Sequence, residues 1–242
     1  MNPDGLEALL PRGTDPHIHL QDQLYGHGRW AVLLLYQSLD AGGRRHGCQV
    51  VSFKAPSTEE LDHDFLWRSL RAQPRGGRVV ASRYHYDDVL VVKMSPDLLD
   101  AAEVPGVLIG RHIWDERYED IRAVERCLAR NGLAIRPFFL HVATGEPKRR
   151  LLARLNAPAT YWKFDLADLE TRDRWDAYMH AYEEAIRETA SDGDAADGPG
   201  GLVQALEKWF TRLVVAAVVV DALQSRSLDA RIDATTLARS GM

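Results

Sequence analysis

The sequence has little cysteine and no long apolar run. Cys48 and Cys127 are the only cysteines in 242 residues. They are too few for a disulfide framework and lack the spacing of a metal site, so a reducing cytoplasm is expected. The longest apolar run, 213–220, is far shorter than a membrane span. No charged-then-apolar signal pattern opens the chain. We therefore expect a cytoplasmic protein with no membrane partner.

An overall excess of positive charge is also missing. The formal net charge is −5 and the isoelectric point is near 6.0, which argues against a general nucleic-acid-binding protein. The hydrophobic content of 45% and the charged content of 27% are ordinary for a soluble globular chain. A chain of this length can bury a full core. The basic residues are clustered locally, which matters more than their total.

Short apolar segments alternate with helical patterns along the chain. Strands are predicted at 31–36, 48–53, 78–82 and 133–142, and helices at 89–94, 115–130, 148–155, 169–189 and 202–223. A capping box predicts a further helix from Ser57. Near the N-terminus a helical stretch is expected to break at Pro11-Arg12-Gly13, 95–113 to be loop, and 191–201 to be a linker. The alternation predicts an α/β fold, a three-layer sandwich with a mostly parallel sheet.

The segment after the first predicted strand has parts of an anion-binding loop. Gly42 and Gly43 let backbone N–H groups converge on a phosphate, and Asp40 can reach a metal ion. A P-loop ends in Gly-Lys-Ser/Thr and leads into a helix. Here Arg44 stands at the lysine position, and the next predicted strand follows too soon for a helical crossover. Taken alone, such a turn is more often a tight connection without a ligand.

A dense polar stretch follows the strand at 78–82. Arg83 can bind phosphate oxygens, and Asp87 or Asp88 can hold a metal ion or contact a ribose or base. In α/β folds, ligands bind beyond the carboxyl ends of strands. The structural alternative is a polar helix start, with aspartates at a favourable N-terminal position.

A basic cluster at helical spacing occupies the third quarter of the chain, and its members are Lys148, Arg149, Arg150 and Arg154, with Lys163 and Arg174 further along. A solvated helix face explains this pattern if nothing else is considered. A polyanionic substrate is the functional alternative, since it requires several positive charges on one segment.

Several segments in order resemble the polyphosphate kinase 2 family, whose members move phosphoryl groups between polyphosphate and nucleotides. The resemblance runs from about residue 19 to 223. It is carried by the segments 51–57 (VSFKAPS), 61–68 (LDHDFLWR), 83–92 (RYHYDDVLVV), 114–118 (WDERY), 138–142 (FFLHV), 162–164 (WKF) and 174–178 (RWDAY).

The resemblance implies a P-loop-kinase-like core with a helical lid at about 144–178, and Mg²⁺-dependent transfer between polyphosphate and AMP or ADP. It implies catalytic roles for Asp40, Arg83 and Asp88, with Asp40 also a metal ligand. The implied nucleotide or phosphate ligands are Gly42, Gly43, Arg44 and Asp87, and the implied polyphosphate ligands are Arg150, Arg154, Lys163 and Arg174. We expect an N-terminal extension at 1–27, the kinase-like domain at 28–223, a tail at 224–242, and a homo-oligomer.

Departures from the family pattern concentrate in the phosphate-binding loop. Ser38 replaces a glycine and Arg44 replaces the lysine, and the following helix is missing. Arginine is a rigid fork and not a compact point charge, so the second change is not conservative. At the second motif, Ser82 replaces an Asp or Asn and Tyr84 a serine. The alternative function is therefore a catalytically inactive pseudoenzyme that binds polyphosphate or a partner subunit.

Overall fold

The computed structural model describes residues 9–37, 49–51, 53, 56–82, 84–95, 97–101, 104–141, 174–189, 201–204 and 208–226. Its strands form one sheet in the order β2-β3-β1-β4-β5, and every pairing is parallel. The strands are β1 (Ala31–Gln37), β2 (Gln49–Val50), β3 (Val79–Ser82), β4 (Leu133–His141) and β5 (Gly201–Gln204). The longer helices are α2 (Leu9–His27), α5 (Asp87–Met94), α7 (Ile113–Arg130), α10 (Trp175–Thr189) and α11 (Lys208–Gln224), and the short ones are α3 (Thr58–Leu61), α4 (Trp67–Arg71) and α6 (Asp97–Ala101). Two 3-10 turns lie at Tyr84–Tyr86 and Gly106–Leu108.

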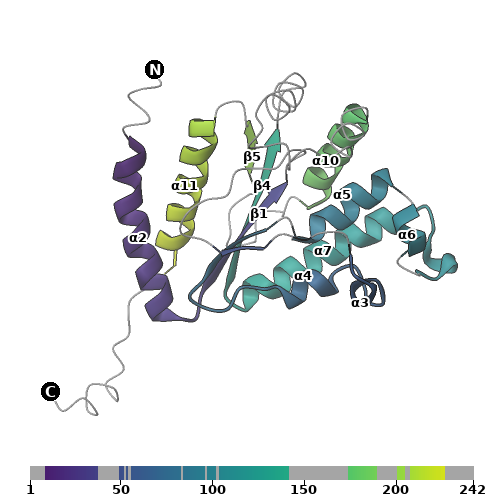
Figure 1. Ribbon diagram of the computed structural model, residues 1–242, viewed down its shortest axis with the longest axis horizontal. Coiled ribbons are helices and arrows are strands. Elements are labelled where there is room, and N and C mark those ends of the chain that lie inside the picture. The colour runs from purple at the N-terminus through teal and green to yellow at the C-terminus, as the bar shows by residue number, and fades with distance from the viewer. Residues whose placement is uncertain are drawn as a thin grey trace, which may run out of the picture.

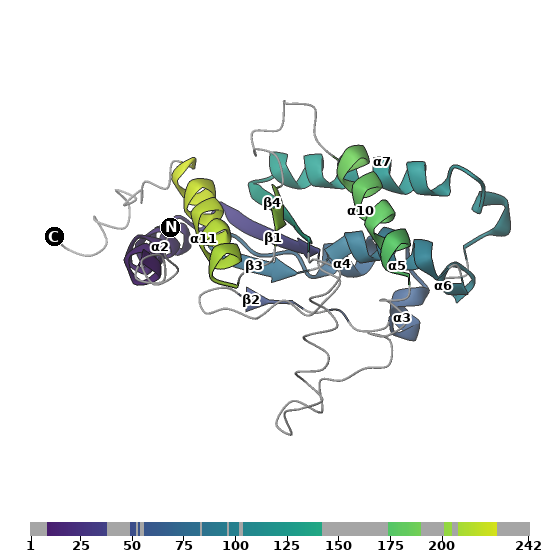
Figure 2. The same ribbon diagram turned by 90° about the horizontal axis from the view of Figure 1, so that it is seen from above.

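Helices cover the sheet on both sides, which confirms the predicted α/β sandwich. Figures 1 and 2 show α2 and α11 on one side of the strands and α5, α7 and α10 on the other. Side chains alternate along β1: Val32 and Leu34 pack toward α2 and α11, whereas Leu33 and Leu35 join the core under α7 and α10. Because β1 is buried on both faces, it reads as a continuous apolar run in the sequence.

The strongest local patterns are confirmed. The strand predicted at 31–36 is β1, the one at 133–142 is β4, and the amphipathic helix predicted at 115–130 is α7. The helix ends at Arg130, and Gly132 just beyond it has a φ of +86°, a backbone conformation that glycine favours at helix ends.

The helix predicted from Ser57 through Leu70 is wrong as one element. Its capping box is present, with the Ser57 hydroxyl accepting the backbone N–H of Glu60 and the Glu60 carboxylate accepting that of Ser57. The helix nevertheless ends at Leu61, and α4 begins at Trp67. Between them, the Asp64 carboxylate accepts the backbone N–H of Leu66 at 2.9 Å, a local bond that competes with helical pairing.

Three further expectations are corrected. Helix α2 runs unbroken through Pro11, which lies in its first turn, where proline needs no N–H donor. The segment 95–113 contains α6 and a 3-10 turn, the latter entered from Pro105. Residues 201–204 form β5, although the last helix was expected to begin at 202, and that helix begins at Lys208. β5 is a strand because it pairs with β4, on the edge of β4 opposite β1. No local sequence pattern predicts this pairing.

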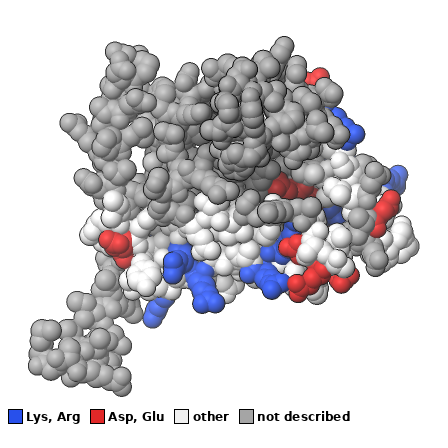
Figure 3. All heavy atoms as spheres, viewed as in Figure 1, with Lys and Arg blue, Asp and Glu red and all other residues white. Residues whose placement is uncertain are grey.

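Charged side chains are unevenly spread over the face drawn in Figure 3. Lys and Arg side chains gather along the lower edge of the described part, beneath the amino ends of the strands. Asp and Glu side chains are more frequent at the lower right, around α3 and α4. No helix among the described residues is both long and apolar enough to span a bilayer.

Candidate functional site

Most of the predicted site residues lie outside the described residues. These are Asp40, Gly42, Gly43, Arg44, Arg83, Arg150, Arg154 and Lys163. Their roles stay predictions. The structure does place Asp87, Asp88 and Arg174, and the two aspartates are surrounded by described residues.

Asp87 and Asp88 open helix α5 beyond the carboxyl end of β3. A single 3-10 turn at Tyr84–Tyr86 separates them from the strand. The first turn of a helix favours acidic side chains, since its backbone N–H groups carry partial positive charge. The sheet and the turn therefore carry two neighbouring carboxylates to the edge where α/β folds bind ligands.

Two arginines from other elements hold Asp88 in place. The guanidinium of Arg68, on α4, lies 3.2 Å from Asp88 Oδ1, and both side chains are nearly buried, at 11% and 13% exposed. Arg117, on α7, donates to the backbone carbonyl of Asp88 at 2.9 Å. The second carboxylate oxygen, Oδ2, is buried and has no hydrogen-bond partner among the described residues.

Burial raises the pKa of Asp88 from 3.8 to about 6. Arg68 opposes this shift and the neighbouring Asp87 adds to it. The ion pair therefore compensates only part of the desolvation of the carboxylate. A carboxylate that is costly to keep charged in the ligand-free protein is typical of a functional site.

Aromatic rings pack against both arginines and restrict them. The Arg117 guanidinium lies 4.6 Å from the ring centre of Phe65 and 5.6 Å from that of Trp114. Arg68 lies 5.1 Å from the ring centre of Phe53. Burial lowers the pKa of Arg117, and Asp88 counters that effect. Stacked guanidiniums of this kind lose little further freedom when they bind, so the backbone around Asp88 is preorganised.

A buried histidine ties the same turn to α7. His85 is fully buried, and its Nε2 lies 3.0 Å from the Glu125 carboxylate. Burial, with Glu125 adding to it, raises the pKa of the adjacent Tyr86. Arg117 and Glu125 lie two turns apart on α7. This helix therefore contacts the start of α5 at Asp88 and the preceding 3-10 turn at His85.

No role was predicted for four further residues of this site, which are Arg68, Arg117, His85 and Glu125. The first three lie within segments that carry the family resemblance. That location was the available signal, but the partner of each residue is too far along the chain to be inferred locally.

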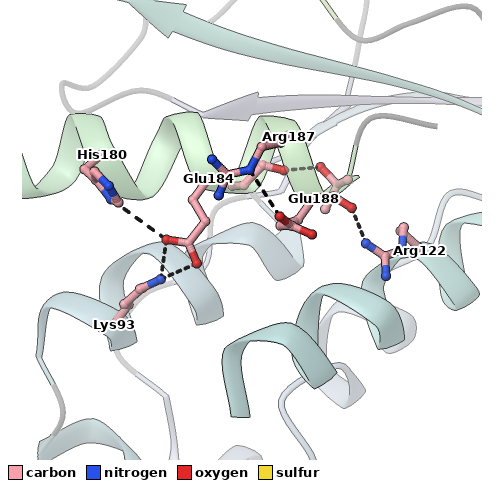
Figure 4. A network of polar contacts seen from close by, with 8 residues as sticks. Lys93, Arg122, His180, Glu184, Arg187 and Glu188 are labelled. Carbon is pink, nitrogen blue, oxygen red and sulfur yellow. Dashed lines mark hydrogen bonds and ion pairs between the residues drawn. The ribbon is translucent and has the colours of Figure 1, made fainter. Parts of the chain in front are cut away.

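Helix α10 is fastened to α5 and α7 by a second polar network (Figure 4). Lys93 donates to both oxygens of Glu184 at 2.5 Å, and His180 lies 3.9 Å from the same carboxylate. Arg122 donates to the backbone carbonyl of Glu188. The C-terminal half of α5 is therefore held from α10, and its N-terminal end from α7.

Arg174, predicted as a polyphosphate ligand, is exposed just before α10. Its guanidinium donates to the backbone carbonyl of Met94, the last residue of α5, at 2.6 Å. A basic group there complements the partial negative charge of a helix C-terminus. This contact joins Arg174 to the helix that carries the two aspartates, and its binding of polyphosphate stays a prediction.

The donors at Asp88 fit a hard divalent cation. Mg²⁺ commonly binds one or two protein carboxylates together with substrate phosphates, and does not need a complete protein cage. The buried Oδ2 of Asp88 is a suitable oxygen ligand that no protein donor in the described part satisfies.

Comparison of the chain with known proteins identifies its family. The model of the family described as Polyphosphate kinase 2 matches residues 16–231. The chain belongs to the polyphosphate kinase 2 family. The resemblance found in the sequence segments is thereby confirmed.

Individual members of the polyphosphate kinase 2 family match over most of the chain. An ADP-polyphosphate phosphotransferase of Rhodopseudomonas palustris is 44% identical over 220 residues, covering 85% of this chain and 75% of that protein. An AMP/ADP-polyphosphate phosphotransferase of Meiothermus ruber is 36% identical over 222 residues, covering 86% and 78%. The crystal structure of polyphosphate kinase 2 from Arthrobacter aurescens TC1 superposes with a TM-score of 0.81 at 30% identity, covering 98% of this chain and 86% of that one. The P-loop-kinase-like fold is thus confirmed.

Proposed function

We propose that this protein transfers phosphoryl groups between polyphosphate and AMP or ADP, with Mg²⁺ bound at the carboxyl edge of the sheet. Membership of the polyphosphate kinase 2 family supports the reaction class, and the names of its relatives support AMP and ADP as the nucleotide substrates. The observation that carries the proposal is the buried Asp88 carboxylate, held by Arg68 on one oxygen and without a protein partner among the described residues on the other.

In this proposal the aspartates Asp40, Asp87 and Asp88 hold the metal and face the nucleotide. Bound Mg²⁺ would neutralise charge on the phosphoryl oxygens during transfer. Phosphate oxygens are bound by Gly42, Gly43, Arg44 and Arg83, and the polyphosphate chain by Arg150, Arg154, Lys163 and Arg174. Arg68, Arg117 and His85 act on the reaction only by holding the start of α5 in place.

The altered phosphate-binding loop favours slow turnover. Arg44 replaces the loop lysine, and only residues 38–48 connect β1 to β2. One lost donor to a developing charge commonly costs about 3–4 kcal/mol of transition-state stabilisation. We therefore expect the reaction of the family at a rate well below that of members with the complete loop.

The decisive experiment measures nucleotide turnover by the full chain with polyphosphate and Mg²⁺, offering AMP and ADP separately. Asp88→Asn should reduce turnover at least about a hundredfold, because a neutral amide replaces a metal-binding carboxylate. Asp22→Asn is the matched control, since it removes the same charge from an exposed position on α2. Wild-type protein that is folded yet shows no turnover with either nucleotide contradicts the proposal.

The replaced lysine also favours a second candidate, a pseudoenzyme that binds polyphosphate or a partner subunit without transfer. It predicts polyphosphate binding that weakens steeply with salt and no nucleotide turnover. Measured turnover that is lost in Asp88→Asn rejects this alternative.

A homo-oligomer and the domain limits at 28 and 223 also stay proposals. Sedimentation of the full chain measures the oligomeric state, and a sedimenting monomer contradicts the first. Limited proteolysis maps the limits, which predict early cleavage only outside 28–223.

A further inference from the structure

Three turns lie side by side at the amino end of the sheet, opposite the aspartates. The segments 73–78, 26–30 and 126–132 lead into β3, β1 and β4. The backbone N–H of Gly77 donates to the carbonyl of Trp30 at 2.7 Å, and that of Ala31 donates to the carbonyl of Gly132 at 3.0 Å. The three turns therefore form one continuous strip along this edge.

Glycines let the backbones of these turns approach closely. A Cβ atom on Gly76 would lie 2.0 Å from the carbonyl oxygen of Gly28, and one on Gly132 would lie 2.9 Å from that of Arg29. Neither position can carry a side chain without moving the backbone. The strip is thus a packed surface with a defined arrangement of the side chains that do project from it.

Those side chains are strongly basic. The three segments contain five arginines and no Asp or Glu. The five, called here the arginine edge, are all exposed: Arg29, Arg75, Arg78, Arg126 and Arg130. The segments that carry them precede β3, β1 and β4, and so lie at the amino end of the sheet.

The arginine edge has no acidic partners within the described part of the chain, unlike the exposed arginines of two surface ion pairs. Among the described residues, none of its five members forms an ion pair. The Arg78 guanidinium makes a cation–π contact, 5.8 Å from the centre of the Tyr25 ring. By contrast, Arg71 pairs with Glu59 at 3.4 Å and Arg187 with Glu188 at 3.2 Å. Uncompensated guanidiniums that lie within about 10 Å of one another reinforce each other's attraction for anions at physiological salt.

We propose that the arginine edge is a second binding surface for polyphosphate, contacted by chains long enough to pass round the sheet while one end occupies the aspartate site. This inference rests on the proposed function for its ligand. A guanidinium fork matches the geometry of phosphate oxygens, and a repeating polyanion can engage several forks in succession. With a net charge of −5 the protein as a whole repels polyanions, so a local basic surface is needed to retain one.

The dimensions of the sheet make the proposal depend on chain length. Neighbouring strands lie about 4.8 Å apart, so the turns before β3, β1 and β4 extend over about 10 Å and match an extended anion better than a single phosphate. Strand β1 has seven residues, which separates the two edges by about 23 Å. Tripolyphosphate can occupy the aspartate site but cannot reach the arginine edge at the same time.

The test compares two triple variants of the full chain. Arg29→Gln, Arg75→Gln and Arg130→Gln together remove three charges from the arginine edge. Arg71→Gln, Arg111→Gln and Arg187→Gln together remove three exposed charges elsewhere. A third protein, with Arg29→Lys, Arg75→Lys and Arg130→Lys, keeps the charge without the fork. Binding of fluorescent long-chain polyphosphate and of tripolyphosphate is measured with salt titration, alongside KM and kcat for both.

For the edge variant we expect about tenfold weaker binding of long-chain polyphosphate, a shallower salt dependence, and a raised KM with unchanged kcat. Tripolyphosphate should be unaffected, the distant variant should behave as wild type, and the lysine variant should lie between. Equal affinity of the wild type and the edge variant for long chains overturns the proposal, as does an equal loss in the distant variant. A preference of the edge for single-stranded RNA of similar charge over polyphosphate also overturns it.

The outcomes also separate this proposal from the proposed function. If no nucleotide turnover is found, the binding measurement still decides whether the arginine edge holds polyphosphate. If turnover is found but the edge variant binds long-chain polyphosphate as tightly as wild type, the proposed function stands and the second surface is rejected.

Discussion

The two ends of the sheet use arginine in opposite ways. At the carboxyl end, Arg68 and Arg117 are nearly buried, lie against aromatic rings and hold Asp88 from two sides. At the amino end, the five members of the arginine edge are exposed and have no acidic partner in the described part of the chain. Buried arginines must be paired, because an unpaired buried charge is very unfavourable, whereas exposed ones remain hydrated. The first group can therefore hold a carboxylate in a fixed position, whereas the second is available to bind an anion from solution.

The largest expected effect is a loss of stability when a buried arginine at the carboxyl end of the sheet is replaced. Arg117→Met keeps the apolar stem but removes the donor to the Asp88 carbonyl and the stacking on Phe65 and Trp114. We expect a loss of about 3 kcal/mol in the free energy of unfolding, measured by denaturant titration. Arg117→Lys keeps the charge and should recover only part of this loss. A methionine variant as stable as wild type would contradict the structural role of Arg117.

The second prediction concerns the stability of the aspartate itself. The pKa of Asp88 is about 6 in the folded protein against 3.8 ordinarily, so between these values the folded state binds more protons than the unfolded state. The carboxyl group therefore lowers stability as the pH rises from 3.8 through 6. Asp88→Asn should be more stable than wild type by about 2 kcal/mol at neutral pH, even though its activity is lost.

Melting curves across pH check this sign. The advantage of Asp88→Asn should shrink on acidification and vanish below pH 3.8, where both forms of residue 88 are neutral. Asp22→Asn, on the exposed face of α2, is the control and should show no such trend. A variant that is less stable than wild type at neutral pH would mean that Arg68 stabilises the carboxylate more than burial destabilises it.

The smallest expected effect is the change in stability when an exposed member of the arginine edge is replaced. Arg29→Gln or Arg130→Gln should change the free energy of unfolding by less than about 0.5 kcal/mol, because an exposed, unpaired guanidinium makes little contribution to stability. Thermal melting of each single variant measures it. A loss as large as that of Arg117→Met would show that these arginines hold the turns together, and the arginine edge would then be structural.

Local patterns were sufficient for the elements whose residues depend on their neighbours in sequence. Strand β1 is apolar on both faces, α7 repeats apolar residues at helical spacing, and the Ser57 capping box is closed by residues three apart. The same reasoning failed between Leu61 and Trp67, where the Asp64 carboxylate bonds the Leu66 backbone, and at β5, whose partner is β4. Those outcomes depend on competing or distant contacts, which periodicity does not contain.

The site shows the same division. Asp87 and Asp88 were predicted from their position after a strand, and the structure places them at the start of α5. Arg68 and Arg117, which hold Asp88, lie 20 and 29 positions away from it in the chain. The first lies before Asp88 and the second after it, on different helices. Their roles depend on which side chains the folded chain buries together.

The sequence alone determined the α/β class, the family resemblance and the pair of acids after β3, because these depend on local order and composition. Only the tertiary structure decided which arginines contact Asp88 and which are exposed. In the sequence both groups are simply arginine, and their partners lie far along the chain. Packing against Phe53, Phe65 and Trp114 excludes water from one group. The meeting of three glycine-bearing turns gathers the other group at the surface. Burial, and not residue type, separates the arginines that hold Asp88 from those that stay exposed.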